Sequence, residues 1–541
     1  GEKNFSLCVL LCTLFLLQST FAIDSTCFDP NTVTGEVNAY QGPSSSKPPL
    51  FDGNPDEMDA IVSLLTVGDS IDGYRLEGKL DGLGLKISSD RRTFELFVTH
   101  SLEDHEGLIR SHGYRGSFVS RWVVDRITLE VLSGGDLTED PEDVSMTNFG
   151  DETKYQPRFR KLSSVEMTEL VHTYDRNTGK GSQIPFLLSG EESAEYGRAW
   201  SFHLNYRNLG EAHELGSLGH VNFEAIHIAP VEQTKTIIMI TDDNDDTIPG
   251  GLVLFYIGEK TDVHDLTSDY NELNKAGLVG GQLTCLSIEG SEEEKTYYPP
   301  NTALDFTLRS LDANLEPVAL RESAREKGCT MFRRPEGGRW RPSRPNEPWF
   351  VTAGSWDPKS GDVDADNDGM IDEVPSDGRV WRLFFQMTGD ELNPRIDSIG
   401  RVGQAYVVYD GGRQLKDLEF SKDGAYAFIS EGPTPDRYDS RLFRFSARAS
   451  DERRLVCLGS HSQPDDSHYS SIVDVSHILA PGWFILADFS SMLAEEALAN
   501  DYLAGQVVLF YDGSAYQNVP PEVLKINFYP LTPTYEVGQE I

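Results

Sequence analysis

The stretch that decides the fold is FRRPEGGRW (332–340), PWFVTAG (348–354), DVDADNDGMIDE (362–373) and GRVWRLFF (378–385). Aromatic and β-branched residues favour strands, and Gly, Pro, Asn and Asp mark the turns between them. The stretch therefore predicts strands separated by a basic linker and an acidic loop. Segments of the same kind recur along the chain, among them TFELFVTH (93–100), TIIMITDD (236–243) and QVVLFYDG (506–513).

Many short strands with few helical periods predict an all-β fold, because α/β proteins alternate strands with helices. A sandwich, a barrel and a propeller all satisfy this pattern. At 541 residues a single β-propeller is the most economical, since blades can be added without enlarging one core. We expect the propeller over residues 61–525, with long inter-strand loops and few short helices. An extended N-terminal segment (23–60) and a C-terminal tail (526–541) would flank it.

Residues 1–22 have the pattern of a secretory signal peptide, with Lys3 before an apolar run and Thr20-Phe21-Ala22 as a small-residue cleavage site. The run is shorter than the ~20 apolar residues that a spanning helix needs. We therefore expect a secreted protein without a membrane span. The formal net charge of −40 also makes nucleic acid and anionic membranes poor partners.

Removal of residues 1–22 leaves Cys27, Cys285, Cys329 and Cys457. Secretion favours one or two disulfides among them, and their spacing leaves every pairing open. No spacing resembles a zinc site. The chain also lacks a P-loop and the Gly-x-Ser-x-Gly and HExxH motifs, so nucleotide enzymes, serine hydrolases and zincins find no support.

Arg334 and Glu336 flank Pro335, so we expect stiff, extended backbone at both positions. Residues two apart in a strand project to the same face, so an arginine and a carboxylate can share one pocket. The planar guanidinium suits a phosphate. Arg334 is therefore the candidate catalytic residue.

The acidic loop predicts a structural calcium site. Asp364, Asp366, Asp368 and Asp372 follow the alternating spacing of a calcium-binding loop, with Gly369 at the sharp turn. Position twelve is proline instead of a bidentate glutamate, and no helices flank the loop, so an EF-hand is excluded.

Other carboxylates follow predicted strands. Glu191 and Glu192 come after one apolar run and Asp242 and Asp243 after another, while Glu224 lies among apolar residues. A buried carboxylate needs a cation partner. Clustered carboxylates suit a hard cation such as Ca²⁺. The alternative is a solvated turn pair for the glutamates and an acidic hairpin tip for the aspartates.

Several motifs together resemble the PhoX-type alkaline phosphatases and their bacterial and algal relatives. They are RPEG (334–337) with Trp340, the GRVWRL segment (378–383), DGLG (81–84), SGEE (189–192) and the Asp-Asp at 242–243. The resemblance spans about residues 81–492. It implies a six-bladed propeller with calcium and iron held at one end of a central channel, where Arg334 would clamp the phosphate. The metal ligands that it implies are Glu191, Glu192, Glu224, Asp242, Asp243, Glu336 and Glu431.

The chain also departs from the family pattern. No cysteine lies between Cys27 and Cys285, so Ser163, Ser164 or Gly190 stands where a cysteine ligand to iron is expected. Serine is a poor substitute for a soft thiolate, which argues against iron. Ser101, His468 and Ser490-Ser491 replace other polar site residues of the family.

Two functions therefore compete. The first is a secreted, metal-dependent phosphatase acting on phosphate monoesters. The second is a catalytically degenerate, calcium-stabilised extracellular module that binds protein partners.

Overall fold

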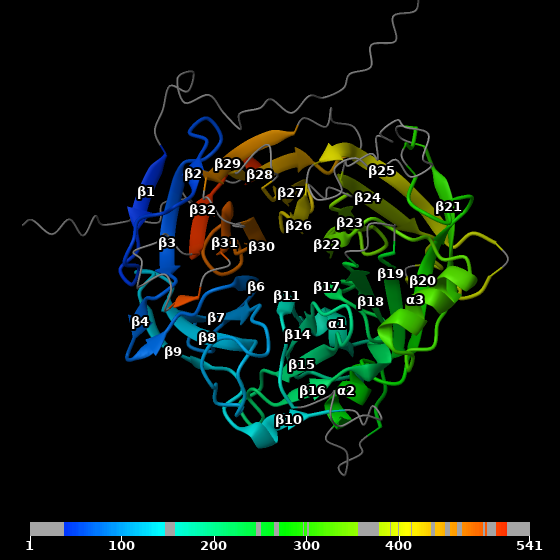
Figure 1. Ribbon diagram of the computed structural model, residues 1–541, viewed down its shortest axis with the longest axis horizontal. Helices are drawn as coiled ribbons and strands as arrows, with labels where there is room; N and C mark the ends of the chain where they lie inside the picture. Colours follow the sequence, from blue (N-terminus) through cyan, green and yellow to red (C-terminus); the bar gives the residue numbers. More distant parts are fainter. Residues whose placement is uncertain are drawn as a thin grey trace, which may run out of the picture.

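Strands of the computed structural model are arranged in sheets around a common centre (Figure 1). The structure describes residues 37–146, 157–244, 250–263, 270–295, 297–299, 302–354, 378–389, 391–398, 400–412, 414–433, 439–448, 455–462, 468–490, 493–494 and 505–516. The predicted signal peptide, the calcium loop with Asp364, Asp366, Asp368 and Asp372, and the C-terminal tail lie outside these residues. The predicted domain boundaries stay predictions.

The sheets follow one another along the chain. A four-stranded sheet has the order β6 (Leu80–Ile87), β7 (Thr93–His100), β8 (Phe118–Asp125), β9 (Val131–Asp136). The next has the order β11 (Leu162–Met167), β14 (Phe186–Glu191), β15 (Ala199–His203), β16 (Ala212–Glu214), β10 (Val144–Ser145). A nine-stranded sheet runs β17 (Phe223–Ile228), β18 (Lys235–Asp242), β19 (Val253–Glu259), β20 (Gln282–Ile288), β21 (Leu304–Ser310), β25 (Gly403–Gly412), β24 (Gly378–Phe385), β23 (Pro348–Thr352), β22 (Pro335–Trp340).

Two further sheets complete the arrangement. One has the order β26 (Leu415–Phe420), β27 (Tyr426–Glu431), β28 (Asp439–Ser446), β29 (Val456–Ser462), β2 (Asp52–Gly53). The other has the order β30 (His468–Asp474), β31 (Trp483–Phe489), β32 (Gln506–Tyr511), β3 (Ala60–Thr66), β1 (Asn38–Gln41). Small hairpins pair β4 (Ser70–Ile71) with β5 (Tyr74–Arg75) and β12 (Tyr174–Asp175) with β13 (Lys180–Gly181). The α-helices of the described part are α1 (Leu170–Thr173), α2 (Asn271–Lys275) and α3 (Pro317–Glu326).

The predicted all-β class with few short helices and a propeller-like arrangement is confirmed. The innermost strands β6, β11, β17, β22, β26 and β30 each contact the next, and β30 contacts β6, so they close a ring (Figure 1). We call them the inner strands.

Strands from the two ends of the chain close the ring in one sheet, where β3 pairs antiparallel with β32 and parallel with β1. Such closure leaves few exposed strand edges. The core lies between neighbouring sheets: Leu96 and Trp122 of one sheet share an apolar cluster with Ile485 and Leu509 of the next.

The structure contains one of the disulfide pairings that the sequence left open. Cys285 in β20 is bonded to Cys329, which follows α3. No helix of the described part is both long and apolar enough to cross a bilayer.

Candidate functional site

The inner strands share one backbone pattern at their beginnings. The first residue of each inner strand pairs with the last residue of the neighbouring strand in its sheet. These pairs are Leu80 with His100, Leu162 with Glu191, Phe223 with Asp242, Pro335 with Thr352, Leu415 with Glu431 and His468 with Phe489. Contacts between neighbouring sheets, such as those of Arg334 with Asp243 and of Lys416 with Glu336, bring these strand beginnings together at one end of the ring.

Each inner strand also has a shift of register near its first residue. Bulges of this kind re-aim side chains and are frequent beside active sites. The shifts contain Asp81, Glu224, Glu336 and Lys416. The irregular backbone at one end of the ring therefore sets the direction of these four charged side chains.

Some residues that enter the inner strands have left-handed backbone. The φ angles are 38° at Lys161, 53° at Arg334 and 52° at Gln414. The expectation of extended backbone at Arg334 is therefore wrong. The Arg334 carbonyl accepts a hydrogen bond from the Ala353 amide, and its guanidinium is bound to carboxylates, and these contacts hold the strained conformation.

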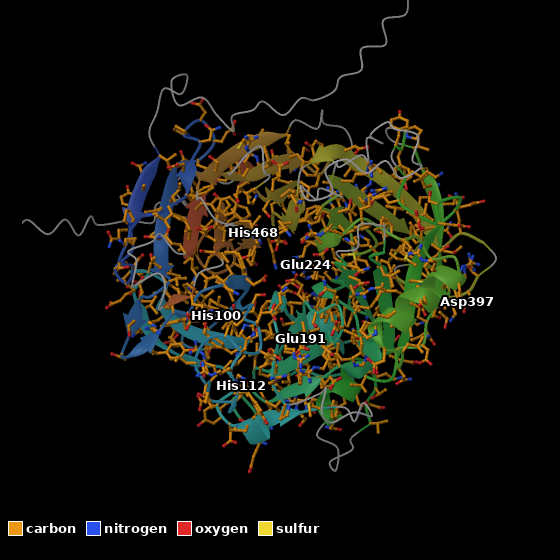
Figure 2. All side chains as sticks on the ribbon, viewed as in Figure 1. His100, His112, Glu191, Glu224, Asp397 and His468 are labelled. Atoms are coloured by element: carbon orange, nitrogen blue, oxygen red, sulfur yellow. A yellow bond between two sulfur atoms is a disulfide. The ribbon has the colours of Figure 1, made fainter. Side chains whose placement is uncertain are left out.

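Adjacent acidic residues at the strand ends point in different directions, because neighbouring residues of a strand project to opposite sides. Glu192 and Asp243 join the charged residues at the centre of the ring. Glu191 and Asp242 do not. Figure 2 labels Glu224 close to the centre and Glu191 farther out.

Glu191 is fully buried in a structural ion pair. Its Oε2 accepts from Arg198 Nε at 2.9 Å, and its Oε1 accepts from Arg198 Nη2 at 2.9 Å and from the Trp200 indole at 3.1 Å. Asp242 is held in the same way, by Arg321 Nε at 2.8 Å and by the Asn222 amide at 2.9 Å. The structure thus places these two predicted ligands against arginines and away from the central carboxylates.

Glu431 occupies the position equivalent to Glu191 in its own sheet. It is buried at the end of β27, directly opposite the buried Arg441 of β28. The residue that follows it, at the position equivalent to Glu192, is Gly432. This sheet therefore places no carboxylate at the position that Glu192 and Asp243 occupy in theirs.

The remaining predicted residues converge. We define the central cluster as Asp81, Lys161, Glu192, Glu224, Asp243, Arg334, Glu336 and Lys416. Oxygen atoms of Glu192, Glu224 and Asp243 all lie within 4.8 Å of one another, a grouping that could hold a metal ion. Carboxylate oxygens are the ligands that Ca²⁺ prefers.

Arg334 and the lysines bind the carboxylates of the central cluster. Arg334 binds Asp243 through two nitrogens, at 3.0 and 3.1 Å, and donates to Glu336 Oε1 at 2.7 Å. Lys416 Nζ donates to the same oxygen of Glu336 at 2.7 Å, and Lys161 Nζ lies 3.2 Å from Glu192 Oε1. The side chains of Arg334 and Lys416 are each 20% exposed, so the cluster is accessible from solvent.

Carboxylates outnumber cations in the central cluster, and their pKa values reflect it. Burial and then the charge of Asp243 raise the pKa of Glu336 to about 7. Burial and then Glu336 raise the pKa of Glu224 well above its usual value, and burial and then Glu192 do the same for Asp81. Burial would raise the pKa of Asp243 too, but Arg334, Lys416 and Lys161 together outweigh it and hold that pKa below the usual value. A bound cation would relieve this repulsion.

The described architecture matches that of a solved structure. PhoX of Pseudomonas fluorescens in complex with vanadate, a transition state analogue, superposes with a TM-score of 0.53, at 12% sequence identity, over 89% of this chain and 98% of that one. This chain has a PhoX-like fold. The resemblance predicted from the sequence is confirmed for the fold, while no protein-family model and no curated protein sequence matches the chain.

Other solved structures match more weakly. The β-propeller domain of Cps50 (Swd1) from Myceliophteria thermophila has a TM-score of 0.31 at 8% identity, covering 80% of this chain and 97% of that one. The polysaccharide lyase Uly1 has a TM-score of 0.31 at 9% identity, covering 80% and 77% of the two chains. Neither value supports an argument about this PhoX-like chain.

The positions at which a cysteine ligand was expected, Ser163 and Gly190, bring no thiolate to the central cluster. The Ser163 hydroxyl donates to the carbonyls of Phe223 at 2.8 Å and Glu224 at 3.0 Å, so it bonds to backbone. A Cβ atom at Gly190 would lie 2.2 Å from the Phe223 side chain, so a larger residue does not fit there. The oxygen donors of the central cluster fit calcium, and they do not supply the soft ligand expected for iron.

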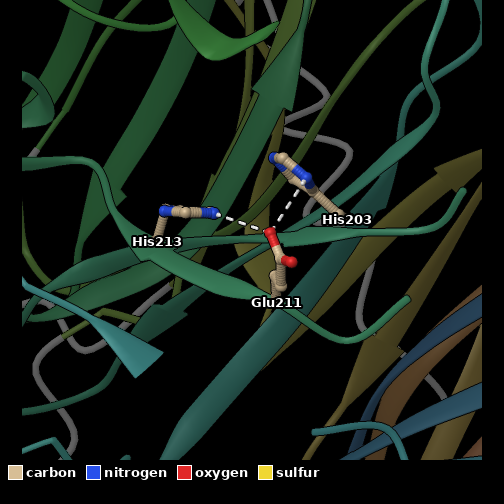
Figure 3. Close-up of side chains that lie close together, drawn as sticks. All are labelled: His203, Glu211 and His213. Atoms are coloured by element: carbon tan, nitrogen blue, oxygen red, sulfur yellow. Dashed lines mark ion pairs between the residues drawn. The ribbon is translucent and has the colours of Figure 1, made fainter. Parts of the chain in front are cut away.

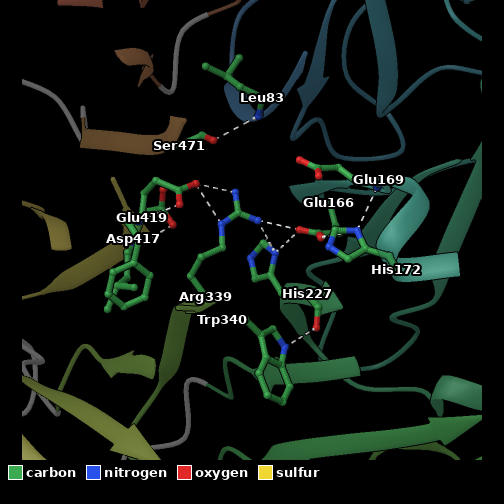
Figure 4. A network of polar contacts seen from close by, with 12 residues as sticks. Leu83, Glu166, Glu169, His172, His227, Arg339, Trp340, Asp417, Glu419 and Ser471 are labelled. Carbon is green, nitrogen blue, oxygen red and sulfur yellow. Dashed lines mark hydrogen bonds and ion pairs between the residues drawn. The ribbon is translucent and has the colours of Figure 1, made fainter. Parts of the chain in front are cut away.

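A second layer of charged residues lies farther along the inner strands (Figure 4). Arg339 donates to Glu166 and to Glu419, at 2.7 Å each, and His227 Nδ1 lies 2.8 Å from Glu166. Asp417 accepts from the Ile472 amide at 2.8 Å, which links β26 to β30. The Arg339 guanidinium lies between two carboxylates and offsets part of their negative charge, so this layer ties the inner strands together beside the central cluster.

Sequence reasoning missed Asp81, Lys161 and Lys416 as members of the central cluster. Asp81 belongs to the DGLG match, and each lysine lies within one residue of the first residue of an inner strand. For Asp81 and Lys416 the signal is a charged residue at the second position of a strand, the position that Glu224 and Glu336 also occupy, whereas Lys161 precedes its strand and carries no such signal.

His100 takes the strand-end position of the first sheet and is structural. It is completely buried, its Nδ1 donates to the Gly78 carbonyl at 3.1 Å, and its Nε2 accepts from the Ser120 hydroxyl at 2.8 Å. A neutral ring that carries its proton on Nδ1 satisfies both contacts. Burial, and then the nearby Arg110, lower the pKa of His100 from 6.5 to about 3.

We expect His100→Gln to flatten the dependence of stability on pH between pH 6.5 and 4. The folded-state pKa lies below the unfolded value, so the unfolded chain takes up the proton first. The stability due to neutral His100 is full above pH 6.5 and falls as the pH drops toward 3, by about 1.4 kcal/mol per pH unit. Urea unfolding at several pH values measures the slope. The exposed His105→Gln is the matched control, and equal slopes for wild type and His100→Gln would contradict the assignment.

Proposed function

We propose that the protein is a metal-dependent phosphatase that hydrolyses phosphate monoesters at the central cluster. The observation that carries the proposal is the convergence of the Glu192, Glu224 and Asp243 carboxylates beside the Arg334 guanidinium. Such a site offers oxygen ligands for a hard cation and a fork of donors for a phosphate. The PhoX-like fold supports the same reading, since the matched PhoX structure holds vanadate.

Each part of the cluster has a role in this proposal. Glu192, Glu224, Asp243 and Glu336 would hold Ca²⁺, which when bound polarises phosphoryl oxygens. Arg334 binds the phosphate and stabilises the negative charge that develops on its oxygens. Lys161 and Lys416 add donors at the same place, and the contacts of Arg334 with Asp243 and Glu336 fix the direction of its guanidinium.

We also propose six blades and a location outside the cell. The strands β17–β21 and β22–β25 would form separate blades of the nine-stranded sheet, because β21 and β25 pair over only a short segment, from Leu304 with Ala405 to Phe306 with Gly403. Each inner strand would then begin one blade. The disulfide Cys285–Cys329 supports secretion, since disulfides persist in oxidising compartments.

A non-catalytic relative is the second candidate. It is favoured by the two lysines, which bind Glu192 and Glu336 where a catalytic centre would use metal charge, and by Ser163, which offers no thiolate. In that case the cluster would serve rigidity, and the outer surface would bind extracellular protein partners.

The deciding experiment combines metal analysis with an activity assay. The purified protein is freed of metal with a chelator, resupplied with Ca²⁺ or iron, and tested on p-nitrophenyl phosphate. We expect hydrolysis that requires Ca²⁺ and does not require iron. A folded protein that binds Ca²⁺ and shows no hydrolysis under any metal condition would contradict the phosphatase proposal and support the second candidate.

We expect calcium to raise the melting temperature through the central cluster, and Glu224→Gln to shrink that rise. A ligand that binds only the native state at a hundredfold excess over Kd stabilises it by about 2.7 kcal/mol. Thermal unfolding with Ca²⁺ and with chelator measures the shift. The exposed Glu130→Gln is the control, and an undiminished shift in Glu224→Gln would place the calcium elsewhere, with the acidic loop at 362–373 as the next candidate.

A further inference from the structure

A second group of ligand-type side chains lies away from the central cluster, on the hairpin of β15 and β16. His203, Glu211 and His213 offer ligand atoms that all lie within 4.8 Å of one another (Figure 3). The backbone explains their convergence. The His203 amide bonds to the Glu211 carbonyl, so these two residues are opposite each other, and Glu211 and His213 are two apart on one strand. All three side chains therefore project from the same face.

The carboxylate of Glu211 is oriented toward both imidazoles. Asn208 Nδ2 donates to Glu211 Oε1 at 2.5 Å. The other oxygen, Oε2, lies 4.0 Å from His203 Nδ1 and 3.8 Å from His213 Nε2 (Figure 3). Asn208 thus does what outer hydrogen-bond partners of metal ligands do, which is to fix the direction of the ligand.

His203 supplies an independent observation. Its side chain is 5% exposed, and neither of its ring nitrogens has a hydrogen-bond partner. Buried polar atoms in native proteins are nearly always paired. The unpaired imidazole of His203 faces a carboxylate and a second imidazole, and this arrangement indicates a bound ligand that would pair with it. The side chain of Glu211 is 32% exposed, which leaves a path from solvent to the group.

We propose that His203, Glu211 and His213 bind a divalent first-row transition metal, with Zn²⁺ as the best fit. Two imidazoles and one carboxylate are a ligand set of zinc sites that keep the fourth position for water. Ligand atoms of a tetrahedral zinc site lie about 3.3 Å apart, given bonds of about 2.0–2.1 Å. The observed separations of 3.8 and 4.0 Å require only small side-chain rotations to close.

Calcium belongs at the central cluster and zinc at this hairpin, because carboxylate oxygens suit hard cations whereas imidazoles suit zinc and its neighbours. The hairpin site does not depend on the phosphatase proposal. Phe186 and Tyr270 pack against His203 and His213, with ring centroids 5.1 Å apart in each case, and give the site an apolar wall.

Co²⁺ is the probe for the test, since its visible absorption is much stronger at a four-coordinate protein site than in water. The full chain is freed of metal, supplied with saturating Ca²⁺ to fill the central cluster, and titrated with Co²⁺ and then with Zn²⁺. We expect one Co²⁺ per chain with this absorption, displaced by Zn²⁺. His203→Gln and His213→Gln should each weaken binding at least about 100-fold, and Asn208→Ala, which removes only the positioning contact, by about 10- to 100-fold. The exposed His105→Gln should bind as wild type does.

Equal Co²⁺ binding in wild type, His203→Gln and His213→Gln would overturn the proposal, and so would absence of the absorption in wild type. Zinc-soaked crystals of the unaltered protein give a check that needs no variant. We expect an anomalous peak bonded to His203 and His213, and an empty site at saturating Zn²⁺ would refute the assignment. Phosphatase activity is measured separately. A result that contradicts the zinc site therefore does not contradict the phosphatase proposal, and the reverse also holds.

Discussion

Arg334→Ala is expected to lower kcat/KM for p-nitrophenyl phosphate by about two to three orders of magnitude, equivalent to about 2.7–4 kcal/mol of transition-state stabilisation. Arg334 binds Asp243 and Glu336 simultaneously, so its guanidinium is already oriented before a phosphate arrives. A donor fixed in this way needs no reorganisation as charge develops on the phosphoryl oxygens. Steady-state kinetics with saturating Ca²⁺ provide the measurement.

Two controls separate this effect from loss of structure. Arg344→Ala removes an arginine whose side chain is 56% exposed and should leave kinetics and melting temperature unchanged. Arg334→Lys keeps the charge and loses the planar fork, so it should recover only part of the activity. If Arg334→Ala retains the wild-type kcat/KM while the protein remains folded, Arg334 does not stabilise the transition state.

The sequence predicted the fold because its main signal is local. Short runs rich in aromatic and β-branched residues, separated by turn residues, specify strands one at a time. Closure of the ring requires β3 and β32 to meet although their sequences lie at opposite ends of the chain. No local pattern encodes that pairing, and the expectation rested on the economy of a propeller.

The structure brings part of the predicted set together. Glu192, Glu224 and Asp243 lie beside Arg334 and Glu336, whereas Glu191 and Asp242 are paired with arginines, and the roles of all of them in metal binding and catalysis stay predictions. Strand alternation alone could have divided each acidic pair, because consecutive residues cannot both face the centre. Which member faces inward depends on register, and the register of β14 against β11 became visible only in the structure.

The positive φ of Arg334 was beyond sequence reasoning for a different reason. A residue before proline is restricted toward extended backbone, and the local rule was applied correctly. Ion pairs with residues far along the chain, such as Asp243, override that preference. Local strain maintained by distant contacts is typical of functional sites.

Arg198→Met is expected to destabilise the protein by about 3–5 kcal/mol, the effect of breaking a buried ion pair from one side. Glu191 is completely buried and Arg198 is 2% exposed, so the carboxylate left behind would have no water to solvate it. The Trp200 indole and the Arg160 amide would still donate to it, which places the expected loss at the lower end of that range. Urea unfolding measures the change.

The double variant Glu191→Leu/Arg198→Met tests whether the buried charge causes the loss. Replacing both partners by apolar residues removes the unsolvated carboxylate, so the double variant should be more stable than Arg198→Met alone. Glu191→Gln then separates the structural role from a ligand role. Since Glu191 is bound to Arg198, we expect Glu191→Gln to keep the full calcium-induced rise in melting temperature that Glu224→Gln loses. If Glu191→Gln loses that rise as well, Glu191 contributes to the calcium site through a rearrangement in which Arg198 releases it.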